Sequence, residues 1–289
     1  MGPRRERVPR AGLRVLLAGL CTVDLVQRVD ELPAPGEKVQ SLRVDVAAGG
    51  PATNAAVTAA ALGAEATLLT VLGAHPLAAL ARADLEAHGV RLIDLAPDLH
   101  DPPPVSAVAV RDRDGERTVV SRNAGGRHFH VKVPIPEADV VLVDGHYPEL
   151  ALADARGTKA PVVLDAGSWR PVLDDLLPLV DVAACSAHFT APAPGLHERG
   201  VGTVITTAGP GPVRWSTADG GSGEVPVPAV EARDTLGAGD VWHGALAVSV
   251  ARELTVTDRI RFANEVAAER VRHVGPRSWT TAIAGRNRT

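Results

Sequence analysis

The heptapeptide Asp234-Thr235-Leu236-Gly237-Ala238-Gly239-Asp240 is followed directly by an apolar stretch, Val241 to Ala251, with helical character. Its two glycines carry no Cβ and let the backbone approach a ligand closely. The unpaired N–H groups and positive dipole end at the start of the helix favour an anion there. A tight turn with Asp240 as a helix cap is the structural alternative. A carboxylate beside an anion site is typical of a base that orients a hydroxyl toward a phosphoryl group.

Short apolar runs alternate with helical stretches over most of the chain. The runs, rich in Val, Leu and Ile, are typical of strands buried on both faces, and they cover Arg14 to Ala18, Ala66 to Leu72, Val140 to Asp144, Pro161 to Asp165, Val180 to Cys185 and Val201 to Thr206. Helices that stop at glycine are predicted over Pro51 to Leu62, Pro76 to His88 and Glu149 to Arg156. This alternation predicts an α/β fold with a mostly parallel sheet and helices on both sides.

Two regions break the alternation. Residues 24–46 have an extended character with several prolines, and residues 105–121 resemble a hairpin that turns at Asp114-Gly115. Together they predict a small β-sheet lid over the carboxyl ends of the main strands, where it would exclude water from a site. An ordinary surface hairpin is the alternative for the second region.

Composition excludes several classes of protein. The formal net charge is −4, which offers no basic surface to nucleic acid or to an anionic membrane, and aromatic residues make up only 3%. The apolar runs are shorter than the roughly 20 residues that span a bilayer. Cys21 and Cys185 form no metal-binding or disulfide pattern, which favours a reducing cytoplasm. Residues 1–12 combine arginines with prolines and glycines and are expected to be disordered.

Three motifs resemble those of the ribokinase-like (PfkB) carbohydrate kinases. Residues 234–240 are similar to the family's DTxGAGD signature, and residues 49–56 to its GG-x-x-x-N motif at the start of a helix. Residues 19–38 resemble its G-x-x-x-x-D...P-x-P-G-E run. Because the motifs stand in the family's order, the resemblance implies a ribokinase-like three-layer α/β/α fold over residues 13–289. The lid strands would come from about 24–46 and 105–121.

The resemblance implies roles for residues of all three motifs. Asp240 would be the catalytic base, and the backbone of Gly237, Ala238 and Gly239 would form the anion hole. The sugar hydroxyls would be held by four residues: Asp24, Gly49, Gly50 and Asn54. Taken singly, Asp24 also fits a turn, and Asn54 also fits the surface of an alanine-rich helix.

The nucleotide site is implied in the same way. Thr207 and Gly209 resemble the family's T-x-G turn, with Gly211 as the later glycine, although the neighbouring prolines depart from the usual spacing. Asn264 falls on a helix that borders the adenine in the family, or is a polar residue on a half-buried helix. The implied cofactors are ATP and Mg²⁺, with a monovalent cation as a further candidate.

One departure from the family concerns its N-x-x-E motif, whose acid helps to organise the magnesium and phosphate waters. The aligned stretch reads Ser186-Ala187-His188-Phe189 and has neither Asn nor Glu. Ketohexokinase-like and sulfofructose-kinase-like members resemble this chain in lacking the plain motif, and residues 241–245 are also similar to theirs. The departure favours a ketose substrate.

These inferences lead to an ATP- and magnesium-dependent kinase that phosphorylates a primary hydroxyl of a small sugar. A sugar- or nucleotide-binding protein that has lost turnover, and a kinase for a nucleoside, remain open as alternatives. A nicotinamide-dependent oxidoreductase would need G-x-G-x-x-G after the first strand, where residues 19–24 read GLCTVD instead. The expected partner is a small-molecule sugar, with no nucleic acid and no membrane. A cytoplasmic homodimer that pairs through its lids is also expected.

Overall fold

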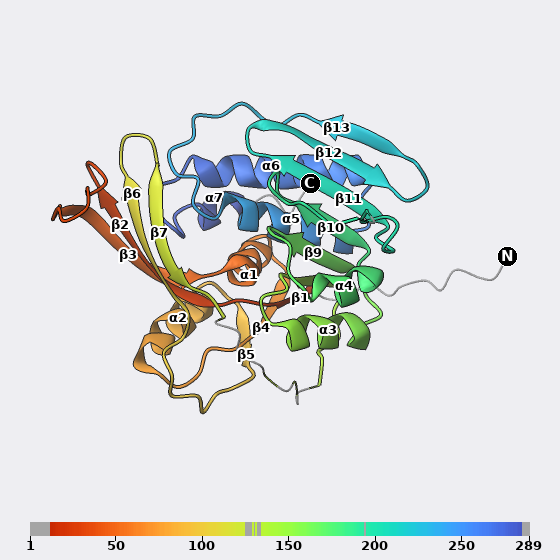
Figure 1. The fold of residues 1–289 in the computed structure, drawn as a ribbon, viewed down its shortest axis with the longest axis horizontal. Helices are drawn as coiled ribbons and strands as arrows, with labels where there is room; N and C mark the ends of the chain where they lie inside the picture. Colours follow the sequence, from red (N-terminus) through yellow and green to blue (C-terminus); the bar gives the residue numbers. More distant parts are fainter. Residues whose placement is uncertain (1–11, 125–128, 130, 132–133, 194, 285–289) are drawn as a thin grey trace.

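A central sheet organises the part of the chain that the computed structural model describes, residues 12–124, 129, 131, 134–193 and 195–284. Within these residues the sheet has nine strands in the order β13-β12-β11-β10-β9-β8-β1-β4-β5 (Figure 1). They are β1 (Arg14–Ala18), β4 (Glu65–Thr70), β5 (Arg91–Asp94), β8 (Val140–Val143), β9 (Val162–Ala166), β10 (Val182–Cys185), β11 (Thr203–Ala208), β12 (Gly211–Thr217) and β13 (Ser222–Val225). Neighbours from β11 to β5 pair in parallel, whereas β12 and β13 join antiparallel. The carboxyl ends of the parallel strands therefore meet at one edge.

Helices cover both faces of this sheet. The face with α1 (Pro51–Ala61) also carries α2 (Pro76–Ala87), α5 (Ala238–Ala251), α6 (Val256–Val271) and α7 (Thr280–Ile283), and the other carries α3 (Pro148–Gly157), α4 (Leu173–Leu176) and the 3-10 helix η1 (Leu177–Leu179). Val15 and Leu17 of β1 pack into the first layer, and Leu16 and Ala18 into the second. Because successive strand residues face opposite sides, a sheet covered on both faces needs continuous apolar runs.

Prolines define where several helices begin. Pro51, Pro76 and Pro148 occupy the first turns of α1, α2 and α3, where an N–H group would have no intrahelical partner. Gly50, before α1, has φ 96°, and a Cβ there would overlap the carbonyl of Leu20. Only glycine allows this close entry to the helix.

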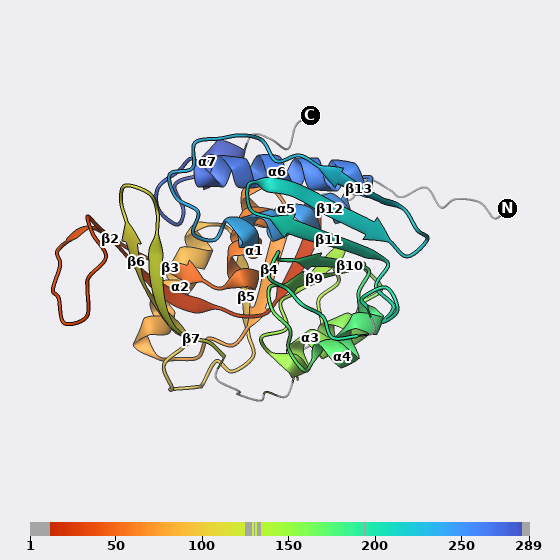
Figure 2. The same cartoon turned by 45° about the horizontal axis from the view of Figure 1, so that its top comes forward.

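A smaller sheet forms the lid. Its strands are β2 (Thr22–Val29), β3 (Ser41–Gly49), β6 (Val105–Arg111) and β7 (Arg117–Arg122), in the order β3-β2-β6-β7 among the described residues. In Figures 1 and 2 this sheet stands to one side of the main sheet, beside α1 and α2. The chain passes from the end of β1 into β2 within a few residues, so the lid begins at the carboxyl edge of the main sheet.

The structure confirms the predicted fold class and the predicted mostly parallel sheet with a β-sheet lid. Each predicted main-sheet strand is present, with ends that differ by at most two residues. The lid strands extend beyond the predicted range, because β2 starts at Thr22 and β3 continues to Gly49. Strands β5, β12 and β13 were not predicted. β5 and β13 are edge strands of four residues each, and β12 and β13 carry polar residues in place of a continuous apolar run. The predicted disordered start falls, for residues 1–11, outside the described residues.

Candidate active site

Asp240 lies in the first turn of α5, half-buried at the carboxyl edge of the sheet. Its pKa is raised from 3.8 to about 6, chiefly by burial and then by the Asp165 carboxylate. The hydrogen bond from Asn54 and the charge of His243 lower this pKa in part. A carboxylate with a pKa near neutral, in this position, can accept a proton from a hydroxyl.

Asn54 joins this carboxylate to the first helix. Its Nδ2 donates to Asp240 Oδ2 at 2.8 Å, while its Oδ1 accepts from Arg277 Nη1 at 3.1 Å. The two bonds define the amide orientation, because only the NH₂ group can donate to a carboxylate and only the oxygen can accept from a guanidinium. The structure therefore brings together the predicted base and a predicted sugar-binding residue that lie 186 positions apart.

Arg277 was missed in the sequence, where it follows α6 without a recognisable motif. Its guanidinium also donates to the Ala48 carbonyl and to Asp84 Oδ2, from Nε at 3.0 Å and from Nη2 at 2.9 Å. Asp84 in turn accepts from the Ala48 amide at 2.9 Å. Against the effect of burial, the hydrogen bond from His88 and the Arg277 guanidinium lower the pKa of Asp84 to about 2. Arg277 thus ties α1, α2 and the end of β3 together around Asn54.

Asp24 approaches the same place from the lid. Its Oδ1 accepts a hydrogen bond from Thr22 Oγ1 at 2.5 Å, and burial raises the pKa of the carboxyl group. Gly49 lies against this carboxylate, because a Cβ on Gly49 would overlap it. A glycine at position 49 therefore leaves room for the Asp24 carboxylate beside the β3 backbone.

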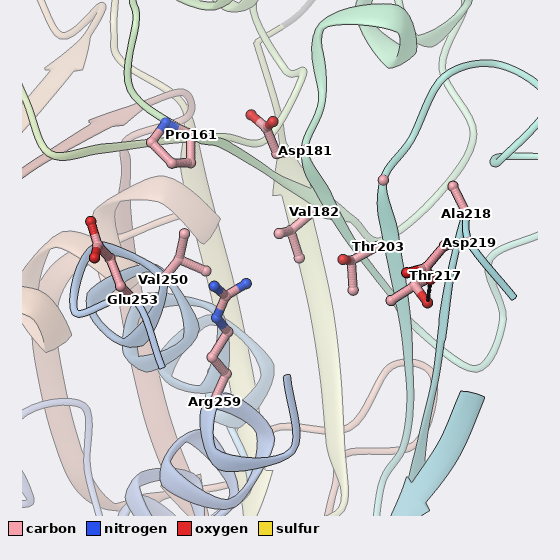
Figure 3. Close-up of a pocket in the computed structure, with 11 residues that line it drawn as sticks. Pro161, Asp181, Val182, Thr203, Thr217, Ala218, Asp219, Val250, Glu253 and Arg259 are labelled. Atoms are coloured by element: carbon pink, nitrogen blue, oxygen red, sulfur yellow. Dashed lines mark hydrogen bonds between the residues drawn. The ribbon is translucent and has the colours of Figure 1, made fainter. Parts of the chain in front are cut away.

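A cavity of about 100 Å³ brings these residues together. Asp24, Gly50, Asn54, Gly237 and Asp240 all line it. A larger cavity of about 540 Å³ lies at the opposite edge of the sheet, among residues at or beside the amino ends of β9, β10 and β11 (Figure 3). Ligands of open α/β sheets bind outside the carboxyl ends of the strands. The smaller cavity, which is lined by Asp24, Asp240 and Asn54, is therefore the candidate active site.

The loop before α5 has the features of an anion site. Gly237 has φ 72°, a left-handed conformation that glycine adopts without strain. The amides of Gly237, Gly239 and Asp240 have no hydrogen-bond partner in the described part of the chain. Such amides at the start of a 14-residue helix can bind a phosphoryl group.

Two details of this loop bear on the implied anion hole, which stays a prediction. The amide of Ala238 already donates to the Thr235 carbonyl at 3.2 Å, as part of the turn into α5. The left-handed residue is Gly237 and not Gly239, whose φ is ordinary and whose Cβ position is open space. The free space at Gly239 lies next to the unpaired amides, so a side chain there would compete with an anion.

Three of the predicted nucleotide residues lie where β11 ends and β12 begins, and the fourth, Asn264, lies on α6. Thr207 Oγ1 donates to the Cys185 carbonyl at 3.3 Å, beside the carboxyl end of β10. Gly209, with φ 57°, turns the chain into β12, which starts at Gly211. Asn264 is buried, accepts from Trp242 Nε1 at 2.8 Å and donates to the Pro226 carbonyl at 3.1 Å. The Asn264 amide therefore has a structural use, and a contact with adenine stays a prediction.

A buried ion pair lies next to Asp240. His243 Nδ1 of α5 is 3.0 Å from Asp165 Oδ2 of β9, and the carboxylate raises the pKa of His243 against the effect of burial. Asp165 stands beside the strand that precedes residues 186–189, where the family's acid is missing. Mg²⁺ takes one or two carboxylates together with substrate phosphates. Asp165 is a carboxylate of this edge that fits such a role and leaves Asp240 free to accept a proton.

Comparisons with known proteins agree with this geometry. The model of the family described as "pfkB family carbohydrate kinase" matches residues 13–282. This chain belongs to that family. It is therefore a carbohydrate kinase, a phosphotransferase with an alcohol group as acceptor.

Individual relatives match this kinase over most of its length. A ribokinase from Bacillus subtilis is 26% identical and covers 88% of this chain and 91% of its own. An ATP-dependent ribose-1-phosphate kinase from Halopiger xanaduensis is 30% identical and covers 94% and 96%. The crystal structure of a putative ribokinase from Agrobacterium tumefaciens has a TM-score of 0.80 at 26% identity, covering 94% and 98%. No helix of the described residues is both long and apolar enough to pass through a bilayer.

Proposed function

We propose that this family member transfers the γ-phosphoryl group of ATP to a primary hydroxyl of a small sugar. The observation that carries the proposal is the 2.8 Å hydrogen bond between Asn54 and Asp240. It places a group suited to bind a sugar hydroxyl against a group suited to deprotonate one. A hydroxyl inserted between them would contact both, next to the unpaired amides of the α5 start.

The chemistry follows from these positions. Asp240 takes the proton of the hydroxyl as its oxygen attacks the γ-phosphorus, and the bond to the bridging oxygen of ADP breaks, with no covalent intermediate. The amides of Gly237, Gly239 and Asp240 stabilise charge on the transferred group. Mg²⁺, bound with ATP, supplies charge neutralisation of the phosphates. Because the transition state is loose, positioning and electrostatics supply most of the acceleration.

Ribose is the first candidate substrate. Relatives that match nearly the whole chain are ribokinases, and a further one acts on ribose-1-phosphate. A ketose is the alternative, supported by the altered residues 186–189 and by residues 241–245. The Arg277 guanidinium lines the cavity, which is the reason to test a phosphorylated sugar as well.

The experiment is a substrate panel with ATP and Mg²⁺ in which ADP release is measured. The panel contains ribose, ribose-1-phosphate, fructose and a nucleoside, with each sugar omitted as the control. Turnover with one of the sugars supports the proposal. Turnover only with the nucleoside, or sugar binding without ADP release, would overturn it in favour of the alternative kinase or of a binding protein.

A variant separates the two substrate sites. Asn54→Ala is expected to raise the KM for sugar by roughly 5- to 150-fold, since a buried hydroxyl without its partner costs about 1 to 3 kcal/mol. The KM for ATP should change little. Asp24→Ala should behave in the same way, and equal effects on both substrates would indicate a general loss of folding instead.

We further propose a homodimer that pairs through the lids. Leu25 alternates with Asp24 and Val26, which line the cavity, so Leu25 lies on the other face of the lid. The register places Val46, Leu25, Ala107 and Val120 in one row across that face. Val46 and Val120 are 46% and 72% exposed. An exposed apolar sheet face of this kind is typical of an interface between copies.

The proposed location is the cytoplasm. Cys21 and Cys185 are both buried free thiols. Free thiols fit a reducing compartment.

A further inference from the structure

Arg270 places a permanent positive charge inside the protein. The residue lies near the end of α6 and its side chain is 1% exposed. A guanidinium keeps its proton at every accessible pH, so its burial requires partners that compensate the charge. Those partners are main-chain carbonyls of the loop that precedes the anion site and of the turn that follows α6.

Three carbonyl oxygens converge on this guanidinium. Nη2 donates to the Leu236 carbonyl at 2.7 Å, and Nη1 donates to the carbonyls of His273 at 2.8 Å and Asp234 at 3.4 Å. The Asp234 carboxylate stands 3.5 Å from Nη2 and completes the group. We call these three carbonyls and the Asp234 carboxylate the carbonyl cage.

The cage acts on the anion site through one peptide unit. The Leu236 carbonyl and the Gly237 amide belong to the same planar trans peptide, in which C=O and N–H point in opposite directions. Because Arg270 holds this carbonyl, the Gly237 amide points away from the guanidinium. Gly237 is one of the residues whose amides have no partner in the described chain. Arg270 is thus a positioning residue for the anion loop.

The family resemblance implies a monovalent cation as a candidate cofactor, and main-chain carbonyls are ligands that proteins use for such ions. The residues of the carbonyl cage do not fit an added ion, because a cationic side chain already occupies it. Arg28, also buried, stands 3.3 Å from the other oxygen of Asp234. One carboxylate therefore faces two guanidinium groups, and no uncompensated negative charge is left for a third cation.

We propose that Arg270 is a tethered replacement for a monovalent metal ion, so that phosphoryl transfer by this protein needs no potassium or sodium. The inference rests on the proposed function for its kinetic readout. Its structural readout, described last, is independent of turnover.

The first test uses the wild-type protein at constant ionic strength, with K⁺, Na⁺ or tetramethylammonium as the monovalent cation. We expect the turnover rates to agree within about twofold, since the guanidinium already holds the loop. A rate that rises tenfold or more on replacing tetramethylammonium with K⁺ would overturn the proposal.

The second test compares two arginines of one helix. Arg270→Ala should lower kcat by roughly 10- to 100-fold, because a displaced loop misplaces the transferred group. K⁺ or guanidinium ion should restore part of the rate, whereas Arg270→Lys should keep part of it without additives. Arg259→Ala is the matched control, because Arg259 lines the cavity at the opposite edge (Figure 3). A folded Arg270→Ala protein with the wild-type rate, or one that no cation rescues, contradicts the proposal.

Thermal melts separate this inference from the proposed function. K⁺ should raise the Tm of Arg270→Ala and leave the Tm of the wild type and of Arg259→Ala unchanged. If this pattern of Tm changes is seen in a protein that phosphorylates none of the sugars, it supports the replacement of the cation by Arg270 and counts against the proposed sugar substrate. If Arg270→Ala does not fold, the wild-type melts and the Arg270→Lys melts decide, and a wild-type Tm that K⁺ raises by several degrees overturns the inference.

Discussion

At the scale of single residues, Asp240 is the proposed catalytic base. Asp240→Asn keeps the size of the side chain but removes the proton acceptor, so we expect kcat to fall by roughly 10² to 10⁴. ATP binding should change little. A variant that keeps more than about a tenth of the wild-type rate at saturating substrates would show that Asp240 is not the base.

The pH dependence of the wild type tests the same residue. The pKa of Asp240 is raised to about 6, and the base must be ionised to accept a proton. We therefore expect kcat/KM to rise about tenfold per pH unit below 6 and to level off above 7. The Asp240→Asn protein should lack this limb.

Two glycines of one loop should respond in opposite ways. Gly237→Ala forces a Cβ into a left-handed conformation and should lower stability by about 1 to 2 kcal/mol. Gly239→Ala has an ordinary φ and open space, so its Tm should equal or exceed that of the wild type. Its Cβ would nevertheless project beside the unpaired amides, and kcat should fall by about tenfold, with larger losses for Gly239→Val. Unchanged turnover in both Gly239 variants, measured beside their melts, would indicate that this loop binds no phosphoryl group.

At the scale of elements, α3 carries a buried acid that the site does not use. Asp154 is fully buried, and neither carboxylate oxygen has a hydrogen-bond partner in the described structure. Burial raises its pKa from 3.8 to about 7. A group whose pKa is raised on folding stabilises the protein below its unfolded pKa, and this stabilisation is lost as the pH rises through 7.

Asp154→Asn should therefore raise the Tm at pH 8 and raise it less at pH 5. The carboxylate is expected to destabilise the wild type by roughly 3 to 4 kcal/mol above pH 7, which the amide avoids in part. Asp175→Asn, which changes an exposed acid on α4, is the control and should leave the Tm unchanged at both pH values. Equal melts of Asp154→Asn and the wild type at pH 8 would contradict a buried ionised acid.

At the scale of the whole molecule, the exposed lid face should set the oligomeric state. Val120 and Val119 are neighbours on β7 that point to opposite faces. Val120→Glu is expected to convert the dimer to a monomer in light scattering after size-exclusion chromatography, because a charge would be buried at the interface. Val119→Glu, on the cavity side, should leave the dimer intact. A monomeric wild type would refute pairing through the lids.

Local patterns in the sequence were sufficient to predict the architecture, and they motivated the prediction of an anion loop. The parallel strands can be predicted because a strand that is covered on both faces is nearly continuously apolar, as residues 15–18 and 140–143 are. The start of α5 can be predicted in the same way, because the glycines and the helix that follows them are neighbours in the chain. Two strands could not be predicted because they lack a continuous apolar run: β12, which pairs with β11, and β13, which pairs with β12.

Only the tertiary structure decided which polar groups meet. Arg277 bonds to Asn54 across 223 positions, and Arg28 of the lid pairs with Asp234 across about as many. The carbonyl cage is likewise formed by segments that lie far apart in the chain. Every residue carries a main-chain carbonyl, so no residue type in the sequence marks such a cage. The sequence by itself determined the fold class and indicated Asp240 as the predicted base, because both inferences depend on neighbours along the chain. The surroundings of that base depend on contacts made after folding, for which no local periodicity exists.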